Sequence, residues 1–265
     1  MALTKFTLYH NTYSVCSIMV RMTLAFRGAP KDDASAMDVE ERIVDIFHEE
    51  QLSEEFLCTV NELGQVPVLA SSNLPENIKD SLDITHFIAK SYPSLIPATH
   101  SEQITRLLFK LHDMNYFSLS FAGRPIVAAS IVAGVEKRLQ QTDNSERYRK
   151  ALESKLDMVN RNKVGGLRPE ITMQMSERAT ALMHEIDALL PEKGIDGQAG
   201  PWLFGLQQPT ALDAHLIVFI ARMRDVNRLE LIPDKLQRYA EEATRTVEWK
   251  QVMFTRRTMA PHHGK

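Results

Sequence analysis

Residues 6–28, FTLYHNTYSVCSIMVRMTLAFRG, contain the pattern that decides the fold. Phe6–Tyr9 is short, aromatic and β-branched, which is typical of a strand. Apolar residues then recur every four positions within Val15–Phe26, which predicts a helix buried on one side. Because a strand followed directly by a helix is how an α/β layer begins, we expect this stretch to open such a domain.

Strand and helix signals keep alternating up to about residue 92. The acidic and small residues of Lys31–Glu41 predict an exposed loop, and Ser53 with acidic neighbours predicts the cap of a short helix. Pro67 within the apolar run Val66–Leu69 places that run at a strand start, a sheet edge or a turn. The further elements expected here are strands over Arg42–Phe47, over Val66–Leu69 and near Ile78, and a helix over Leu82–Ala89.

Strand signals vanish after Ser91–Thr99, which carries two prolines and is interpreted as a linker. We therefore predict the α/β plus all-α fold class, with an α/β domain over residues 1–92 and an all-helical domain over residues 99–265. The expected helices span Ile104–Phe121, Ile126–Gln140, Glu146–Asn160, Ile171–Leu190, Ala211–Val226, Asp234–Ala243 and Val247–Arg256.

The composition is typical of a globular protein, since 44% of the 265 residues are hydrophobic and 25% are charged. A net charge of −3 predicts no nucleic-acid partner, because backbone binding needs a concentrated basic face. Apolar runs shorter than the roughly 20 residues of a membrane helix predict no membrane partner. Two cysteines exclude a disulfide framework and favour a reducing, cytoplasmic location. The nine histidines lack a metal-ligand spacing, so we expect no metal.

Ser14-Val15-Cys16-Ser17 stands where the first strand gives way to the first helix. Backbone N–H groups at a helix start are unpaired and carry positive potential. A hydroxyl or thiol at this place can stabilise a thiolate, either its own or that of a ligand. The alternative is that Ser14 only caps the helix and that Cys16 is a small buried apolar residue.

Two further places could recognise a peptide-like ligand. A cis bond before Pro67 would leave the backbone N–H and C=O of Val66 free to pair with an extended peptide, whereas a trans bond would make it an ordinary strand start. Asp80 and Ser81 stand at a predicted helix start, where N–H groups bind carboxylates and the acid can hold an ammonium group. Together these two residues suit an α-amino acid head group, and the alternative is simple capping.

Two patterns in the second half are interpreted as structural. Thr210 and Asp213 are three residues apart ahead of an apolar helix, which predicts a capping box without chemistry. The basic residues of Arg222–Arg228 are interrupted by acidic and apolar ones, which predicts a solvated helix face.

The stretches LYHNTYSVCSIMVRMTLAFRG, NELGQVPVL, KDSLDITHFIAKSYP and WLFGLQQPTALDAHL resemble the glutathione transferase superfamily, over most of the chain. The first stretch resembles most the zeta class of maleylacetoacetate isomerase-like proteins, which has a Ser-Ser-Cys-Ser run ahead of Val-Arg. The resemblance implies a thioredoxin-like N-terminal domain, an all-helical C-terminal domain, glutathione as cofactor and a homodimer.

The resemblance also implies roles for single residues. Ser14 matches the serine that hydrogen-bonds the glutathione sulfur, and Cys16 matches the cysteine of the class. Val66, between Gln65 and Pro67, matches the residue whose backbone pairs with the cysteinyl part of glutathione.

The two ends of glutathione have counterparts as well. Asp80 and Ser81 match the pair that holds the γ-glutamyl head group. Gln51 matches a polar contact to the glycyl end, with His48 as the alternative.

Two departures from the family pattern bear on the chemistry. Val15 replaces the second serine of the class, and the helical domain gains tens of residues between Phe117 and Ile171. A serine at position 14, where thiol-transferase-like members have cysteine, disfavours deglutathionylation. Other classes activate the thiol with tyrosine or asparagine, so alternatives to Ser14 are Tyr9, Asn11 and Tyr13.

We therefore expect an enzyme that activates the glutathione thiolate for attack on a small or bulky electrophilic metabolite. The outcome would be conjugation, or cis–trans isomerisation when the addition reverses after bond rotation. The alternatives are a non-catalytic module of the same fold that binds or regulates partners, and a helix-rich scaffold without a ligand.

Overall fold

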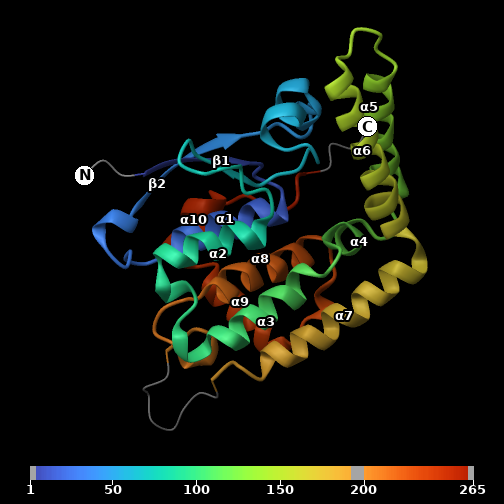
Figure 1. Cartoon of the computed structure of the whole chain (residues 1–265). Coiled ribbons are helices and arrows are strands. Elements are labelled where there is room, and N and C mark those ends of the chain that lie inside the picture. The colour runs from blue at the N-terminus through green and yellow to red at the C-terminus, as the bar shows by residue number, and fades with distance from the viewer. Residues whose placement is uncertain (1–3, 192–199, 262–265) are drawn as a thin grey trace.

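Figure 1 shows the computed structural model, which describes residues 4–191 and 200–261. Its first part contains a three-stranded sheet in the order β2–β1–β3, in which β1 pairs parallel with β2 and antiparallel with β3. Helix α1 connects β1 to β2, so these three elements form a βαβ unit. The bounds are Thr4–His10 for β1, Val15–Phe26 for α1, Met37–Ile43 for β2 and Val68–Ala70 for β3.

The second strand begins earlier than the sequence predicts. Part of the expected loop over Lys31–Glu41 pairs with β1, and the expected strand over Arg42–Phe47 overlaps β2 only at its first two residues. Because β2 lies at the edge of the sheet and buries one face at most, the charged residues between its apolar ones are tolerated. The strand expected near Ile78 is reduced to a single bridge with Leu69.

The helices predicted over Val15–Phe26 and Leu82–Ala89 are confirmed as α1 and α2, and α2 spans Ser81–Ser91. Both helices lie on the same side of the sheet (Figure 1). Their apolar faces meet the inward residues of β1, and Leu8 and Ile84 are fully buried there. The apolar residues that alternate along β1 and those that recur every four positions in α1 therefore pack into the same hydrophobic core.

The segment predicted as a linker is packed against both parts of the chain. Tyr92 and Leu95 within it are buried, and the Tyr92 hydroxyl accepts a hydrogen bond from the backbone N–H of Met37 at 2.9 Å. Its prolines initiate or precede short helical turns rather than an extended connection. The large hydrophobic core is shared by the sheet, by α1 and α2, and by the helices that follow.

The second part is helical throughout its described residues, and none of these helices is long and apolar enough to cross a membrane. The single helix expected over Ile104–Phe121 is divided in two. Asn115 caps the second piece, where its side-chain oxygen accepts from the N–H groups of Phe117 and Ser118 at 3.0 and 3.1 Å. The helices are α3 Ser101–His112, α4 Tyr116–Phe121, α5 Pro125–Leu139, α6 Glu146–Val159, α7 Pro169–Asp187, α8 Ala211–Asp225, α9 Asp234–Ala243 and α10 Val247–Met253.

Helix α8 runs through the centre of the helical part and packs against α1 (Figure 1). The predicted capping box at its start is confirmed, because Thr210 and Asp213 bond each other's backbone N–H groups. Every residue from Ala211 to Met223 is buried. A helix that is buried all round is surrounded by other elements, so α8 is the element on which the rest of the fold is assembled.

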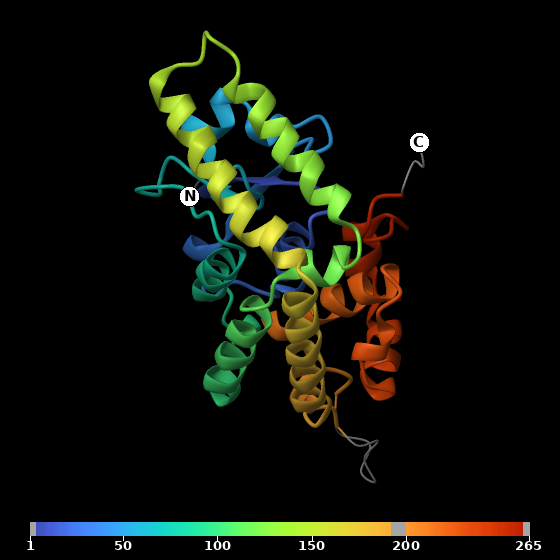
Figure 2. The same ribbon diagram turned by 90° about the vertical axis from the view of Figure 1, so that its right-hand side faces the viewer.

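The extra residues between Phe117 and Ile171 form a helical hairpin of α5 and α6, followed by a π-helical turn over Asn160–Val164. Figures 1 and 2 show this hairpin standing beside the N-terminal part rather than in the helical bundle. It packs on the segment that precedes β3, where the Tyr148 hydroxyl donates to the Leu52 carbonyl at 2.6 Å. A separate small core of buried side chains joins the two, formed by Leu52, Leu57, Val135, Tyr148 and Leu152.

Candidate functional site

Two of the predicted segments meet at the start of α1. Ser14 is the N-cap, and its Oγ accepts from the backbone N–H of Ser17 at 3.4 Å. The same hydroxyl donates to the carbonyl oxygen of Val66 at 3.4 Å, and the peptide bond between Val66 and Pro67 is cis. Residues that are 52 positions apart in the sequence are thus in contact at a helix N-terminus.

The start of α2 lies beside the start of α1. Asp80 is exposed and caps α2, with one carboxylate oxygen accepting from the N–H groups of Leu82 and Asp83 at 2.7 and 3.2 Å. The hydroxyl of Ser81 shares a hydrogen bond with the thiol of Cys16, which lies in the first turn of α1. The tertiary structure therefore brings both predicted helix starts to one place.

Cys16 is electrostatically poor as a nucleophile. Burial raises the pKa of its thiol, as does the charge of Asp80, while the hydrogen bond with Ser81 and the charges of Arg222 and Lys163 oppose that rise. Burial is the largest of these effects, so the thiol form is favoured at neutral pH. The side chain contributes a hydrogen-bonding group next to Ser81 rather than a thiolate.

The predicted alternatives to Ser14 have other partners. The Tyr9 ring packs edge-on against Phe56 at 6.2 Å between centroids and lies under the guanidinium of Arg42. The Asn11 amide donates to the Val44 carbonyl at 2.9 Å, and its oxygen accepts from the N–H of Tyr13 at 2.9 Å. The two Asn11 contacts hold the turn between β1 and α1, which places Ser14. The Tyr13 ring packs edge-on against that of Phe47, so among these candidates it is Ser14 whose side chain contacts Val66.

The two predicted contacts to a glycyl end differ in their surroundings. The His48 side chain is exposed and pairs with Asp45 at 2.7 Å, and this hydrogen bond raises the pKa of His48. The Gln51 side-chain oxygen is buried without a hydrogen-bond partner among the described residues. An unpaired buried acceptor is costly, so Gln51 is the better placed of the two to accept from a ligand. Gln65 is exposed, and its amide nitrogen lies 3.9 Å from the sulfur of Met158 in α6.

Two buried cations that sequence reasoning missed hold the two segments of the site in place. Arg222 of α8 is 4% exposed and donates to the carbonyl of Tyr13 at 2.6 Å. Lys155 of α6 is 3% exposed and donates to the carbonyls of Leu63 and Gly64 at 2.7 and 2.8 Å. Within the described ranges, neither has a carboxylate at ion-pair distance.

The solvated face predicted for Arg222–Arg228 is therefore wrong at its first residue. Arg222 directly follows the apolar run of α8, a helix that is buried all round. Its position at the end of that run was the sequence signal that could have predicted its burial. Lys155 continues the apolar stripe of Tyr148, Leu152 and Val159, so a charged residue on a buried face was the signal there.

Burial sets the charge states of these cations. It lowers the pKa of Lys155 to about 7, helped by the nearby charge of Lys163, and it lowers the pKa of Arg222 to about 10. Burial also lowers the pKa of Lys163 to about 8, where its ammonium lies 4.3 Å from the centroid of the Phe117 ring. The charges of Arg222 and Lys163 both act on the thiol of Cys16 at the start of α1. Because no carboxylate of the described residues is paired with them, they favour binding of an anion or a thiolate beside that helix start.

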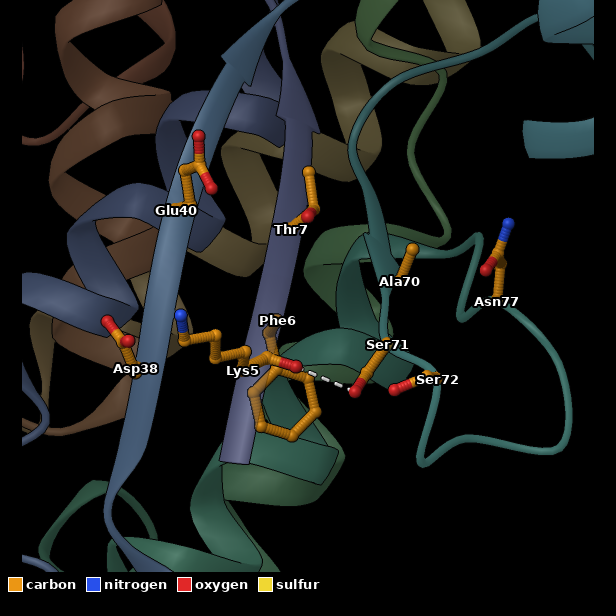
Figure 3. A pocket seen from close by; sticks show the side chains of 9 residues that line it. All are labelled: Lys5, Phe6, Thr7, Asp38, Glu40, Ala70, Ser71, Ser72 and Asn77. Atoms are coloured by element: carbon orange, nitrogen blue, oxygen red, sulfur yellow. Dashed lines mark hydrogen bonds between the residues drawn. The ribbon is translucent and has the colours of Figure 1, made fainter. Parts of the chain in front are cut away.

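A hollow of about 710 Å³ lies elsewhere, on the polar face of the sheet (Figure 3). Its lining residues Lys5 and Thr7 alternate along β1 with the buried Phe6 and Leu8, so they face away from the core. Its lining shares no residue with the convergence of α1 and α2, and we place the candidate site at that convergence because the buried polar groups lie there. Within the described residues, no group of histidine, cysteine or acidic side chains is arranged to hold a metal.

No protein-family model and no curated protein sequence matches the chain. Solved structures do match. A glutathione transferase from Pseudomonas putida, with one glutathione disulfide bound per subunit, is 14% identical with a TM-score of 0.60, and the match covers 95% of this chain and 92% of that one. A glutathione transferase from Populus trichocarpa is 16% identical with a TM-score of 0.59, covering 97% and 100%.

A maleyl pyruvate isomerase, described as a bacterial glutathione transferase of the zeta class, is 18% identical with a TM-score of 0.55, covering 97% and 100%. These matches span several classes and share little sequence with this chain, so they show the fold and no particular class. The predicted fold class is confirmed. The chain has the glutathione transferase fold, with a thioredoxin-like N-terminal sheet followed by a helical C-terminal domain.

Proposed function

We propose that the chain binds glutathione where α1 and α2 begin and activates its thiol for attack on a small electrophile. The observation that carries this proposal is the contact between the Ser14 hydroxyl and the Val66 carbonyl at 3.4 Å, next to Ser81 of α2. The fold supports it, because a structurally similar glutathione transferase homologue from Sulfitobacter, 15% identical with a TM-score of 0.56, was solved with bound glutathione.

Each part of the ligand would have its own contact. The γ-glutamyl head group would lie at Asp80 and Ser81, where the backbone N–H of Ser81 and the positive end of α2 would attract its carboxylate and Asp80 would attract its ammonium. The cysteinyl backbone would pair with Val66, between Gln65 and Pro67. The amide N–H of the glycyl residue would donate to the buried side-chain oxygen of Gln51.

The reactive group would be the glutathione thiolate. A free thiol with a pKa near 8.5 is mostly protonated at neutral pH, and each pKa unit of lowering corresponds to about 1.4 kcal/mol. The Ser14 hydroxyl would turn from Val66 to the sulfur, and the positive end of α1 with the charge of Arg222 would stabilise the anion.

The thiol proton leaves to solvent, and the sulfur lone pair forms a bond to an electrophilic carbon. With an activated aryl chloride, chloride leaves with its bonding pair. With an unsaturated carbonyl compound, the C=C π pair moves onto the carbonyl oxygen as an enolate, which then takes up a proton or expels the thiolate again. The product is a conjugate when that bond persists, or a cis–trans isomer when an unsaturated carbonyl compound rotates before the bond breaks again. Cys16 serves in this scheme by holding Ser81. We also propose a homodimer, which light scattering would detect as twice the mass of the chain.

The test combines binding and turnover. Calorimetry measures glutathione uptake, and an assay with 1-chloro-2,4-dinitrobenzene and an enone measures reaction. We expect Ser14→Ala to bind glutathione within about threefold of the parent protein and to lose about a hundredfold in kcat/KM, because the thiolate loses its donor. Ser130→Ala, on the exposed side of α5, is the matched control. Absence of glutathione uptake at millimolar concentration would overturn the proposal, and uptake without turnover on any electrophile would favour a binding module.

A further inference from the structure

Two histidines from the helical part, the fully buried His215 and the partly buried His112, lie directly behind Ser81. His112 is the last residue of α3, and His215 lies in the second turn of α8. Nε2 of His112 is 2.7 Å from Nδ1 of His215, and Nδ1 of His112 is 3.5 Å from the Ser81 hydroxyl. The candidate site is thus joined by hydrogen bonds to the interior of the helical part.

The far end of this chain of bonds fixes where its protons lie. Nε2 of His215 is 3.1 Å from the hydroxyl of Thr23 in α1 and 3.0 Å from that of Thr85 in α2. Each hydroxyl has one proton, and both are already donated to backbone carbonyls, by Thr23 to Met19 and by Thr85 to Ser81. Both hydroxyls therefore accept from His215, whose Nε2 carries the hydrogen.

The same reasoning runs back to Ser81. A neutral imidazole has one N–H, so Nδ1 of His215 is an acceptor and Nε2–H of His112 donates to it. Nδ1 of His112 is then an acceptor as well, and the Ser81 hydroxyl donates to it. Burial lowers the pKa of His112 to about 4 and lowers that of His215 well below its ordinary value, so both rings stay neutral near pH 7.

A hydroxyl that gives its proton to His112 presents only lone pairs to Cys16. The protonated thiol of Cys16 then donates to Ser81, which ties the first turn of α1 to the start of α2. The hydrogen bond that lowers the pKa of Cys16 has Ser81 as the donor to the sulfur, so it forms only when the hydroxyl turns away from His112. Because Ser81 is 4% exposed and these contacts surround it, its orientation is set by the protein before any ligand arrives.

We propose that His112, held in one tautomer by His215, is a positioning residue that orients the Ser81 hydroxyl and so sets the geometry of the α1–α2 convergence for its ligand. The effect on ligand affinity rests on the proposed function, whereas the direction of the hydrogen bonds does not. The four helices joined in this way are α1, α2, α3 and α8.

Two substitutions separate the two nitrogen atoms of His112. In His112→Asn the side-chain oxygen replaces the acceptor Nδ1 and keeps the contact with Ser81, but the donor to His215 is lost. In His112→Gln the amide replaces Nε2–H and keeps the contact with His215, but Ser81 loses its acceptor. We expect glutathione to bind His112→Asn within about twofold of the parent protein and to bind His112→Gln about tenfold more weakly. Equal losses in both would mean that His112 only packs, and His184→Gln, on the exposed side of α7, is the control.

The pH dependence of Cys16 alkylation would not change if His112 only packed against its neighbours. In a Cys58→Ser background, we expect His112→Gln to lower the pH midpoint of alkylation by about one unit, because the freed Ser81 hydroxyl can donate to the thiolate. His112→Asn should leave the midpoint in place, since the charges of Asp80, Arg222 and Lys163 that act on the thiol are unchanged. An unchanged midpoint in His112→Gln would overturn the proposal.

Nitrogen-15 NMR tests the tautomers directly. Both histidines should be neutral with hydrogen on Nε2 from about pH 5.5 to about pH 8. A hydrogen on Nδ1 of either ring in that range would contradict the proposed chain. If the parent protein takes up no glutathione, the proposed function fails while alkylation and NMR still decide the role of His112.

Discussion

The two segments of the candidate site are held by cations of different kinds. The Tyr13–Ser14 turn is held by Arg222, which comes from the central helix α8 and also bonds Ser120 and Thr258. The segment before Val66 is held by Lys155, which comes from the α5–α6 hairpin and bonds backbone carbonyls. Arg222 remains charged at neutral pH, whereas Lys155 titrates near it, so we infer one permanent and one pH-dependent attachment.

We expect the largest loss of stability when the Arg222 attachment is removed. We expect Arg222→Met to lower the free energy of unfolding by about 3 kcal/mol, because several buried acceptors lose a charged donor at once. Urea unfolding measures the change. The matched control is Arg224→Met on the same helix, whose partly exposed pair with Glu241 is worth less than about 1 kcal/mol. Similar losses of unfolding free energy in the two variants would show that the buried Arg222 contributes no more stability than an exposed ion pair.

Unfolding at acid pH tests two histidines that are charged in the unfolded chain but neutral in the folded protein. The pKa values of His10 and His112 are both lowered to about 4, chiefly by burial, from an ordinary 6.5. The unfolded chain therefore binds more protons between these values, and stability falls as the pH drops from about 6.5 to about 4, by roughly 3 kcal/mol per histidine. Urea midpoints across that range measure the slope.

His10→Phe should remove about a third of that acid slope, because the buried His215 contributes to it beside His112. Both ring nitrogens of His10 are buried without hydrogen bonds among the described residues. A slope equal to that of the parent protein would count against His10 as a source of acid sensitivity.

Alkaline pH sharpens the contrast between the two attachments. Because the pKa of Lys155 is lowered to about 7, the unfolded chain binds more protons above that value, so stability should rise with pH from about 7 upward. The rise has an upper limit of about 1.4 kcal/mol per pH unit. Lys155→Met should abolish the part of the rise that begins near pH 7 and leave the part above about pH 8, to which Lys163 contributes, while Lys150→Met, an exposed residue of the same helix, should retain both parts. A rise near pH 7 that survives Lys155→Met would assign that titration to another group.

The smallest expected effect concerns the hairpin alone. Tyr148→Phe removes the hydroxyl that donates to Leu52, which should cost about 1 kcal/mol in urea unfolding. We expect glutathione affinity to stay within about twofold of the parent value, because this contact lies in the small core between the hairpin and the N-terminal part. A larger loss of affinity would show that the hairpin controls the site through more than Lys155.

The local features of the site were predictable because they are written in neighbouring residues. The cap at Ser14, the helix start at Asp80–Ser81 and the capping box at Thr210 each follow from a few side chains and their own backbone. The contact between Ser14 and Val66 was not predicted, since no local pattern joins positions 52 apart and the family resemblance gave each residue only a separate contact to one ligand.

The groups behind the site were not predictable from local pattern. His112 and His215 are 103 positions apart, and Arg222 reaches a carbonyl 209 positions away. A charged or polar residue inside an apolar run tells only that its side chain has a buried partner, and the partner is defined by how the helices pack. The second strand was misplaced for a similar reason, because pairing with β1 outweighed the acidic composition of β2.

The sequence by itself determined the order of strands and helices, the α/β plus helical class and the residues that begin α1, α2 and α8. These properties depend on periodicity and capping, which act over a few residues. Only the tertiary structure decided that two helix starts converge, that two buried cations hold their flanking segments, and that a hairpin leans on the N-terminal part. Those contacts join distant residues, and their energies exist only once packing has removed water from around them.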